Sequence, residues 1–263
     1  MTNISTPRTI LFDVYDVLFS GTPDMGFSLY LAEKAKTDPR INASFDGNVR
    51  SVLYGLLSRY CPLCSFAVCR SLVPHNPGAH VKRALKEGTL TYEQLKVGIT
   101  YMLTHHVQCP PQTRIILDYA AEYFSNPQFS VAAWHSLPQG QALFKQAIAH
   151  YGPAQVFVLS NMPAEIFTAF KNRFPDIYSL LSEDHWMVSG HIGAAKPKPD
   201  GFAYALHRMG CAASQVLFID DKEENCVVAR GQGMQALQFT VPPSTLLQEW
   251  YHSIGFKGDG NKD

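Results

Sequence analysis

Apolar runs alternate with helical patterns over the second half of the chain. Runs typical of buried strands lie at residues 155–159, 187–189, 216–219 and 235–239. Apolar residues at helical spacing lie between them, at residues 139–150, 163–173, 200–209 and 223–231. Strands that alternate with helices predict a parallel sheet with helices on both faces.

The first half of the chain has a different pattern. Residues 8–12 form an apolar run that ends at Asp13 and predicts one buried strand, whereas residues 19–126 carry helical patterns with almost no strand signal. Thr89 or Thr91, followed by Glu93 or Gln94, resembles the start of a helix. We therefore expect an α/β core of residues 1–20 and 127–263, interrupted after its first strand by an all-helical insertion at 21–126.

Composition and charge narrow the possible functions. The 263 residues are 46% hydrophobic and 17% charged, which is typical of a folded globular protein. The 22 basic and 22 acidic residues cancel, so no overall field attracts nucleic acid or an anionic membrane, and an anionic substrate needs a local site. The N-terminus lacks a signal-peptide pattern, and no stretch approaches the ~20 apolar residues of a membrane span. We expect a cytoplasmic protein without nucleic-acid or membrane partners.

The six cysteines do not predict a disulfide framework, because the chain shows no export signal. Cys61 and Cys64 form a Cys-x-x-Cys pair, and Cys69, His75 and His80 follow, so a zinc site is conceivable. The spacing does not repeat that of a zinc ribbon or finger, which favours free thiols.

Polar residues with useful chemistry follow the predicted strands or precede helices. They are Asp13, the pair Ser160-Asn161, Lys196, and the pair Asp220-Asp221. Each one alone is an ordinary turn former, helix cap or solvated loop residue. In a parallel sheet, however, positions just past the strand ends converge on one edge, where such sheets bind ligands.

The segments around these residues resemble, in the same order, the four signature motifs of the haloacid dehalogenase superfamily. The segments are ILFDVYDVL, VFVLSNM, GAAKPKPDGFAYAL and VLFIDDKEENCVVARGQGM. The resemblance covers residues 8–20 and 139–240, and the insertion corresponds to that family's helical cap. It implies a hydrolase with a Rossmann-like core.

A group of carboxylates at this edge calls for a cation. Two like charges ~4 Å apart repel by about 4 kcal/mol at an effective dielectric constant near 20, and Lys196 offsets only one of three carboxylates. Hard oxygen ligands suit Mg²⁺. The resemblance implies that Asp13, Asp220 and the main-chain carbonyl of Tyr15 bind it, with Asp221 acting through water or in an outer shell.

The resemblance also implies a mechanism. Asp13 is the expected nucleophile and forms an aspartyl-phosphate that water hydrolyses. Lys196, the Ser160 hydroxyl and Mg²⁺ are expected to hold the phosphoryl oxygens, while Asn161 either reaches the substrate or orients Ser160. Lys198 is an alternative to Lys196, but the spacing to residues 201–204 fits Lys196 better.

The sequence departs from the phosphatase pattern at Tyr15. Most phosphatases of this superfamily have a second Asp there, which serves as the general acid and base. A Tyr occupies this position in the metal-free 2-haloacid dehalogenases, but Val17 and the pair Asp220-Asp221 do not fit those enzymes. Asp16, one place later, is an alternative acid, although successive side chains diverge as a chain leaves a strand.

Three functions therefore remain open. The first is a Mg²⁺-dependent phosphatase of a small phosphorylated metabolite, with motifs closest to the glucose-1-phosphate phosphatase branch and its small helical cap. The second is a metal-free dehalogenase, and the third is a weakly catalytic protein that binds a phosphorylated ligand. We expect a monomer or a homodimer.

Overall fold

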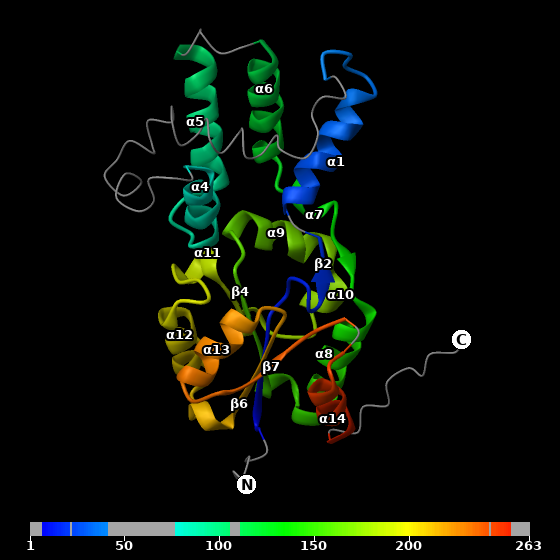
Figure 1. The fold of residues 1–263 in the computed structure, drawn as a ribbon, viewed down its shortest axis with the longest axis vertical. Helices are drawn as coiled ribbons and strands as arrows, with labels where there is room; N and C mark the ends of the chain where they lie inside the picture. The colour runs from blue at the N-terminus through cyan, green and yellow to red at the C-terminus, as the bar shows by residue number, and fades with distance from the viewer. Residues whose placement is uncertain (1–6, 22, 42–76, 106–110, 242, 254–263) are drawn as a thin grey trace, which may run out of the picture. The chain divides into compact units, whose positions relative to one another are not determined.

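The chain folds into two compact units. The computed structural model describes residues 7–21, 23–41, 77–105, 111–241 and 243–253. The first unit comprises Met1–Ser20, His135–Asn161 and Phe174–Asp263, and the second comprises Gly21–Trp134 and Met162–Arg173 (Figure 1).

A five-stranded parallel sheet forms the middle of the first unit, with the strand order β5-β4-β1-β6-β7. Its strands are β1 (Thr9–Phe12), β4 (Val156–Ser160), β5 (Trp186–Val188), β6 (Val216–Asp220) and β7 (Gln235–Gln238). The central strand β1 pairs with β4 on one side, with Phe12 opposite Val158, and with β6 on the other, with Phe12 opposite Ile219. The predicted parallel α/β core is confirmed.

Helices cover both faces of this sheet. They are α8 (Pro138–Tyr151), α10 (Pro175–Tyr178), α11 (Ser189–Ile192), α12 (Pro199–Met209), α13 (Glu223–Gly231) and α14 (Thr245–Ser253). Short 3₁₀ turns lie at Pro153–Gln155, Glu183–His185 and Ala213–Gln215. Figure 1 shows α12 and α13 on one side of the sheet and α8 on the other. The sequence pattern predicted α8, α12 and α13, but not α14.

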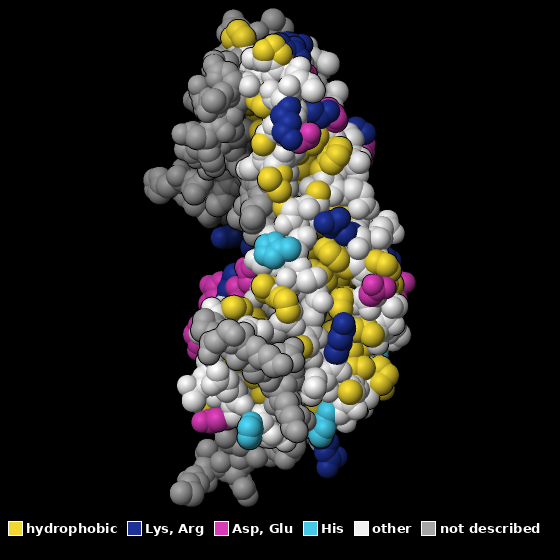
Figure 2. Space-filling view, turned by 90° about the vertical axis from the view of Figure 1, so that its right-hand side faces the viewer, with side chains coloured by type: hydrophobic (Ala, Val, Ile, Leu, Met, Phe, Trp, Pro, Cys, Tyr) yellow, Lys and Arg dark blue, Asp and Glu magenta, His cyan; other side chains and the backbone are white. Residues whose placement is uncertain are grey.

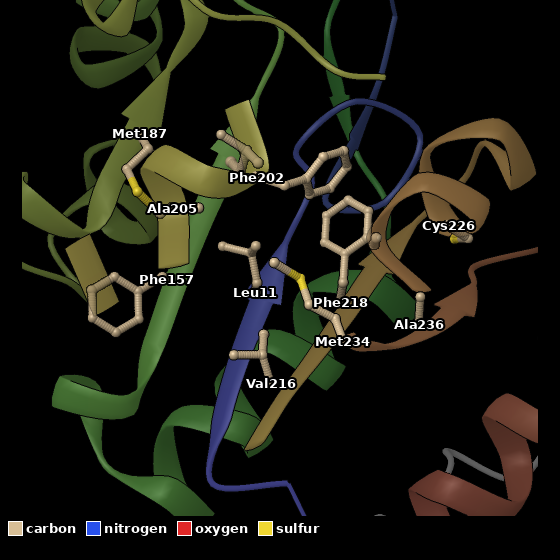
Figure 3. Packing of buried hydrophobic residues seen from close by; sticks show 12 residues of the cluster. Leu11, Phe157, Met187, Phe202, Ala205, Val216, Phe218, Cys226, Met234 and Ala236 are labelled. Atoms are coloured by element: carbon tan, nitrogen blue, oxygen red, sulfur yellow. The ribbon is translucent and has the colours of Figure 1, made fainter. Parts of the chain in front are cut away.

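Alternate residues of β1 face opposite layers of the core. Leu11 packs with Phe202 of α12 and Phe218 of β6, in the cluster drawn in Figure 3. Phe12 makes an edge-to-face contact with Phe144 of α8, with ring centroids 5.2 Å apart. Because both faces of the strand are buried, its last three residues, Ile10–Phe12, are all apolar rather than alternating.

The chain leaves β1 through a tight loop. Within it, the Leu18 N–H donates to the Val14 carbonyl (2.9 Å) and the Asp16 N–H to the Phe19 carbonyl (2.7 Å). Asp16 has φ 53°, in the left-handed region that Asp tolerates better than most residues. The loop is held from the side by α8, since the Leu137 N–H donates to the Leu18 carbonyl (3.0 Å).

A second, two-stranded sheet joins the two ends of the insertion. It pairs β2 (Phe19–Ser20) antiparallel with β3 (His135–Ser136). These strands were not predicted, because two residues carry no periodicity and their pairing spans the whole insertion. Directly beyond them, Gly21 (φ 114°) lies against Ala133, where an added Cβ would be 2.7 Å from the Ala133 carbonyl oxygen.

The described residues of the second unit form helices. They are α1 (Pro23–Ala35), α4 (Pro77–Lys86), α5 (Tyr92–His105), α6 (Pro111–Ser125), α7 (Gln128–Val131) and α9 (Ala164–Arg173). Its core is aromatic: the ring centroids of Phe27 and Tyr123 are 4.9 Å apart, and those of Tyr30 and Phe129 are 4.8 Å apart. This is the inserted helical unit that the sequence predicted.

The start of α5 shows why α9 belongs to the helical unit. Thr91 and Gln94 form a reciprocal cap, in which the Gln94 N–H donates to the Thr91 hydroxyl (3.1 Å) and the Thr91 N–H to Gln94 Oε1 (2.9 Å). The next amide, that of Tyr92, donates to Glu165 of α9 (3.0 Å).

The sequence assigned residues 162–173 to the core and placed the cap at 21–126, and those boundaries stay a prediction.

Some predicted features fall outside the described residues. They include the helical patterns at 42–76 and the cysteines Cys61, Cys64, Cys69 and Cys109. The two described cysteines, Cys211 and Cys226, are free thiols. Among the described helices, none combines the length and the apolar character needed to cross a membrane. On the face shown in Figure 2, the described basic side chains are interspersed with acidic ones.

Replacing Gly140 by alanine should strain the contact between α8 and the loop after β1. An added Cβ would lie 1.6 Å from the Val17 carbonyl oxygen, which is backbone and cannot rotate away. We expect Gly140→Ala to destabilise the protein by about 2 kcal/mol in urea unfolding. Gly231→Ala is the matched control, because no atom lies within 4 Å of its added Cβ. Equal stability of the two variants would contradict the packing described.

Candidate functional site

Asp13 stands at the carboxyl end of the central strand. Its N–H donates to the Ile219 carbonyl (2.9 Å), which extends the pairing of β1 with β6 by one residue. Its carboxylate oxygen Oδ1 accepts a hydrogen bond from the Val14 N–H (2.7 Å). Asp13 is 3% exposed, so an ionised carboxylate here needs strong local compensation.

Lys196 supplies part of that compensation. Its Nζ lies 2.6 Å from Asp220 Oδ2 and 3.0 Å from Asp13 Oδ1, and its side chain is 1% exposed. Burial opposes the charge of the ammonium group, but Asp13 and Asp220 outweigh this effect and raise the pKa of Lys196. Lys198, the alternative lysine, is exposed. Of the two lysines, Lys196 is therefore the one that contacts the carboxylates.

The structure brings Asp13, Asp220 and Asp221 together, with one oxygen of each within 4.8 Å of the others. Burial, reinforced by neighbouring carboxylates, raises the pKa of Asp13 to about 6 and that of Asp221 to about 7. The carboxyl of Asp220 is also buried, but Lys196 lowers its pKa. The buried Lys196 contacts two of the three carboxylates, and the largely exposed Lys222 lies 3.8 Å from the third, so the charges inside the cluster are only partly balanced.

The two adjacent aspartates have different surroundings. Asp220 Oδ1 accepts hydrogen bonds from the Lys222 N–H (2.9 Å) and Asn225 Nδ2 (2.8 Å), and Oδ2 accepts one from Lys196. Asp221 Oδ1 is buried without a hydrogen-bond donor among the described residues, and the Lys222 ammonium lies 3.8 Å away. Asp221 therefore has a carboxylate oxygen that is available to an added cation.

Ser160 is the last residue of β4, the strand that pairs with β1, and Asn161 directly follows it. Ser160 is fully buried, and its hydroxyl has no hydrogen-bond partner among the described residues. Such a group is uncommon in a folded interior and points to a ligand that completes it. The Asn161 amide is occupied, because Nδ2 donates to the Lys196 carbonyl (2.7 Å) and Oδ1 accepts from the Lys196 N–H (2.8 Å).

Sequence reasoning missed one buried residue of this cluster. Asn225, 2% exposed, lies on the first turn of α13 and orients Asp220 through its amide. Its position five residues after Asp220, at the start of a predicted helix, was the available signal. Tyr15 is half-buried and forms an isolated bridge with Phe19, so its main chain belongs to the loop that carries the site.

Part of the chain is similar in sequence to two fungal proteins. No protein-family model matches it. It is 27% identical over 93 residues to the sesquiterpene phosphatase astK of Aspergillus oryzae (35% of this chain, 46% of astK). It is 31% identical over 88 residues to the drimenol cyclase drtB of Aspergillus calidoustus (34% of this chain, 16% of drtB). The chain thus matches less than half the length of either relative.

Comparisons of structure define the class of fold. The HAD family enzyme bt-2542 of Bacteroides thetaiotaomicron aligns with a TM-score of 0.54 at 16% identity (95% of this chain, 98% of that one). Its complex with magnesium and inorganic phosphate aligns at 0.50 and 18% (90% and 96%). A 2-haloacid dehalogenase from Pseudomonas syringae aligns at 0.54 and 15% (88% and 85%). The chain therefore has the haloacid dehalogenase fold.

Asparagine substitutions at Asp220 and Asp221 should change stability in opposite directions. At pH 8 without metal, Asp221→Asn should stabilise the protein by about 1–2 kcal/mol, because it removes a crowded charge. Asp220→Asn should destabilise it by about 3 kcal/mol, since Lys196 loses a buried partner. Thermal unfolding measures both.

The gain from Asp221→Asn should also depend on pH. A carboxyl whose pKa is raised by folding lowers stability as pH rises from its unfolded value of 3.8 to about 7, and the loss is complete above that. The gain should therefore be smaller at pH 5 than at pH 8. The same gain at both values would contradict the described environment of Asp221.

Proposed function

We propose that this chain is a Mg²⁺-dependent phosphomonoesterase that forms an aspartyl-phosphate on Asp13. The observation that carries the proposal is a cluster of three carboxylates around a buried lysine, beside a buried serine hydroxyl that has no hydrogen-bond partner among the described residues. The cluster suits a cation, and the lysine and hydroxyl suit phosphoryl oxygens. Two comparisons support it: the solved complex of bt-2542 with magnesium and phosphate, and the phosphatase name of astK.

The residues present fit Mg²⁺. The sequence predicted Asp13, Asp220 and the main-chain carbonyl of Tyr15 as direct ligands. We propose Asp221 in place of Asp220, because Asp221 Oδ1 accepts no hydrogen bond from the described residues. We assign Asp220 to holding Lys196, since donors already occupy both of its oxygens. When bound, Mg²⁺ supplies positive charge that neutralises the carboxylates and favours the developing charge on phosphoryl oxygens.

The proposed reaction has two steps. A carboxylate oxygen of Asp13 forms a bond to phosphorus while the bond from phosphorus to the leaving oxygen breaks. Water then attacks the aspartyl-phosphate, releases inorganic phosphate and restores Asp13. In both steps the Lys196 ammonium and the Ser160 hydroxyl stabilise charge on the transferring group.

The leaving oxygen lacks the usual acid. Tyr15 occupies that position, and a phenol with a pKa near 10 is a weak substitute at neutral pH. Without a general acid, catalysis loses a factor of about 10² to 10⁴. We therefore expect slow turnover that increases for phosphate esters with better leaving groups. A 2-haloacid dehalogenase also shares the fold, so halide release without metal belongs in the same assay.

We propose a small phosphorylated metabolite as the substrate, and a sesquiterpenyl monophosphate as the first member to test. The support for this choice is the name of astK, a sesquiterpene phosphatase. A sugar phosphate of similar size is the matched comparison, because it carries the same phosphoryl group on a polar body. Faster release of phosphate from the sugar ester would overturn the choice of a terpenoid.

Asp13→Asn should abolish turnover. The amide cannot form the acyl-phosphate, so we expect phosphate release to fall at least ~10³-fold. EDTA should stop the parent enzyme, and added Mg²⁺ should restore it. Asp184→Asn is the control, because Asp184 is an exposed aspartate that pairs with Arg208. Full activity of Asp13→Asn, or turnover in EDTA, would refute the proposed mechanism.

Asp16→Asn separates a structural role of Asp16 from a catalytic one. Asp16 Oδ1 accepts a hydrogen bond from the Ser20 hydroxyl (2.9 Å), and its backbone is left-handed. Asn tolerates this conformation and keeps the acceptor, so we expect kcat to change less than ~3-fold. A loss of ~10² or more would instead identify Asp16 as the general acid. The pH profile of kcat distinguishes the two results independently.

A further inference from the structure

The main chain of Lys196 is held in place by one side chain. Lys196 lies between α11 and α12, past the end of β5, where the pairing of β4 with β5 has stopped. Its N–H and its carbonyl are both bound by the Asn161 amide, at 2.8 and 2.7 Å. The Asn161 side chain thus makes the two main-chain hydrogen bonds that a paired strand would make to Lys196 if the sheet extended this far.

The position of the Lys196 main chain determines where its ammonium group lies relative to Asp13 and Asp220. Lysine is a flexible stem with a point charge, so its own rotamers fix the ammonium only weakly. Here Nζ is 2.6 Å from Asp220 and 3.0 Å from Asp13, within a buried cluster. A displacement of about 1 Å at the start of the stem would disturb both contacts, and errors of that size lower catalytic rates strongly.

We propose that Asn161 is a positioning residue that fixes Lys196 through its main chain and does not contact the substrate. We call the two hydrogen bonds from the Asn161 amide to the main chain of Lys196 the clamp. Asn161 directly follows Ser160, so adjacent residues carry the buried hydroxyl and the clamp. The clamp therefore keeps Ser160 and Lys196 in a fixed relation at the end of β4.

The alternative, that Asn161 reaches the substrate, conflicts with its hydrogen bonds. Turning the amide toward a ligand would break both bonds to Lys196. Lys196 is 4% exposed, so its N–H and carbonyl would then be buried without partners. Leaving buried main-chain groups unsatisfied is unfavourable, and a ligand contact to one amide would not offset two such losses.

Hydrogen exchange of the Lys196 amide tests the clamp in the full-length, metal-free protein. Asn161→Ala removes both hydrogen bonds, so this amide should exchange at least ~10-fold faster than in the parent. Ser160→Ala is the matched control, because it changes the neighbouring residue and leaves the clamp intact, and it should stay within ~3-fold of the parent. Unchanged exchange in Asn161→Ala would overturn the proposal.

A second variant covers the case in which Asn161→Ala does not fold. Asn161→Asp has nearly the same shape and still accepts from the Lys196 N–H, but it cannot donate to the Lys196 carbonyl. The Lys196 amide should exchange faster in Asn161→Asp than in the parent, because the loop loses the bond to the Lys196 carbonyl. Exchange as slow as in the parent at the amides of both Lys196 and Lys198 would show that the carbonyl bond does not hold the loop, and would contradict the proposal.

The kinetic arm rests on the proposed phosphatase function. With a phosphate ester that the parent hydrolyses, Asn161→Asp should lower kcat ~10-fold or more while KM changes less than ~3-fold. The affinity for inorganic phosphate should fall in Ser160→Ala but stay within ~3-fold in Asn161→Asp. A raised KM and weakened phosphate binding in Asn161→Asp would identify a substrate contact and overturn the proposal. If the parent hydrolyses no ester, the phosphatase function fails, while the exchange experiment still decides on the clamp.

Discussion

The site depends on the pairing of β1 between β4 and β6. The four residues Thr9–Phe12 bond to strands on both sides that follow the whole insertion in sequence. Because all three strands run parallel, their carboxyl ends reach the same edge of the sheet. Asp13, Ser160 and Asp220 lie at that edge, so a single buried strand sets the relative positions of the candidate site residues.

The charges at this edge oppose stability. Three carboxylates lie together, only two of them contact the buried Lys196, and burial raises the pKa of Asp13 and Asp221. A protein selected for stability alone would not retain this arrangement, since removing a crowded charge is favourable. A ligand that neutralises the cluster stabilises the folded chain by mass action. Binding and folding are therefore coupled at the same carboxylates.

The sequence predicted the sheet and the residues at its edge because their signals are local. The strand Val216–Asp220 begins with four consecutive apolar residues, and its last residue, Asp220, is followed directly by Asp221. The pairing of β2 with β3 and the hydrogen bonds made by Asn161 and Asn225 could not be predicted from the sequence. They depend on which loop passes beside which side chain, and an asparagine after a strand has the same local pattern whether it caps a helix, binds a ligand or holds a loop.

The β2–β3 pair has an evolutionary consequence. It holds the two ends of the insertion together, and Gly21 allows the two backbones to approach closely. The inserted segment is therefore a loop whose two ends are held at a fixed distance by the β2–β3 pairing. Lengthening such a loop changes its closure entropy slowly, by about 0.6 kcal/mol for each doubling of its length. The insertion can thus change in length while the sheet that carries the candidate site stays intact.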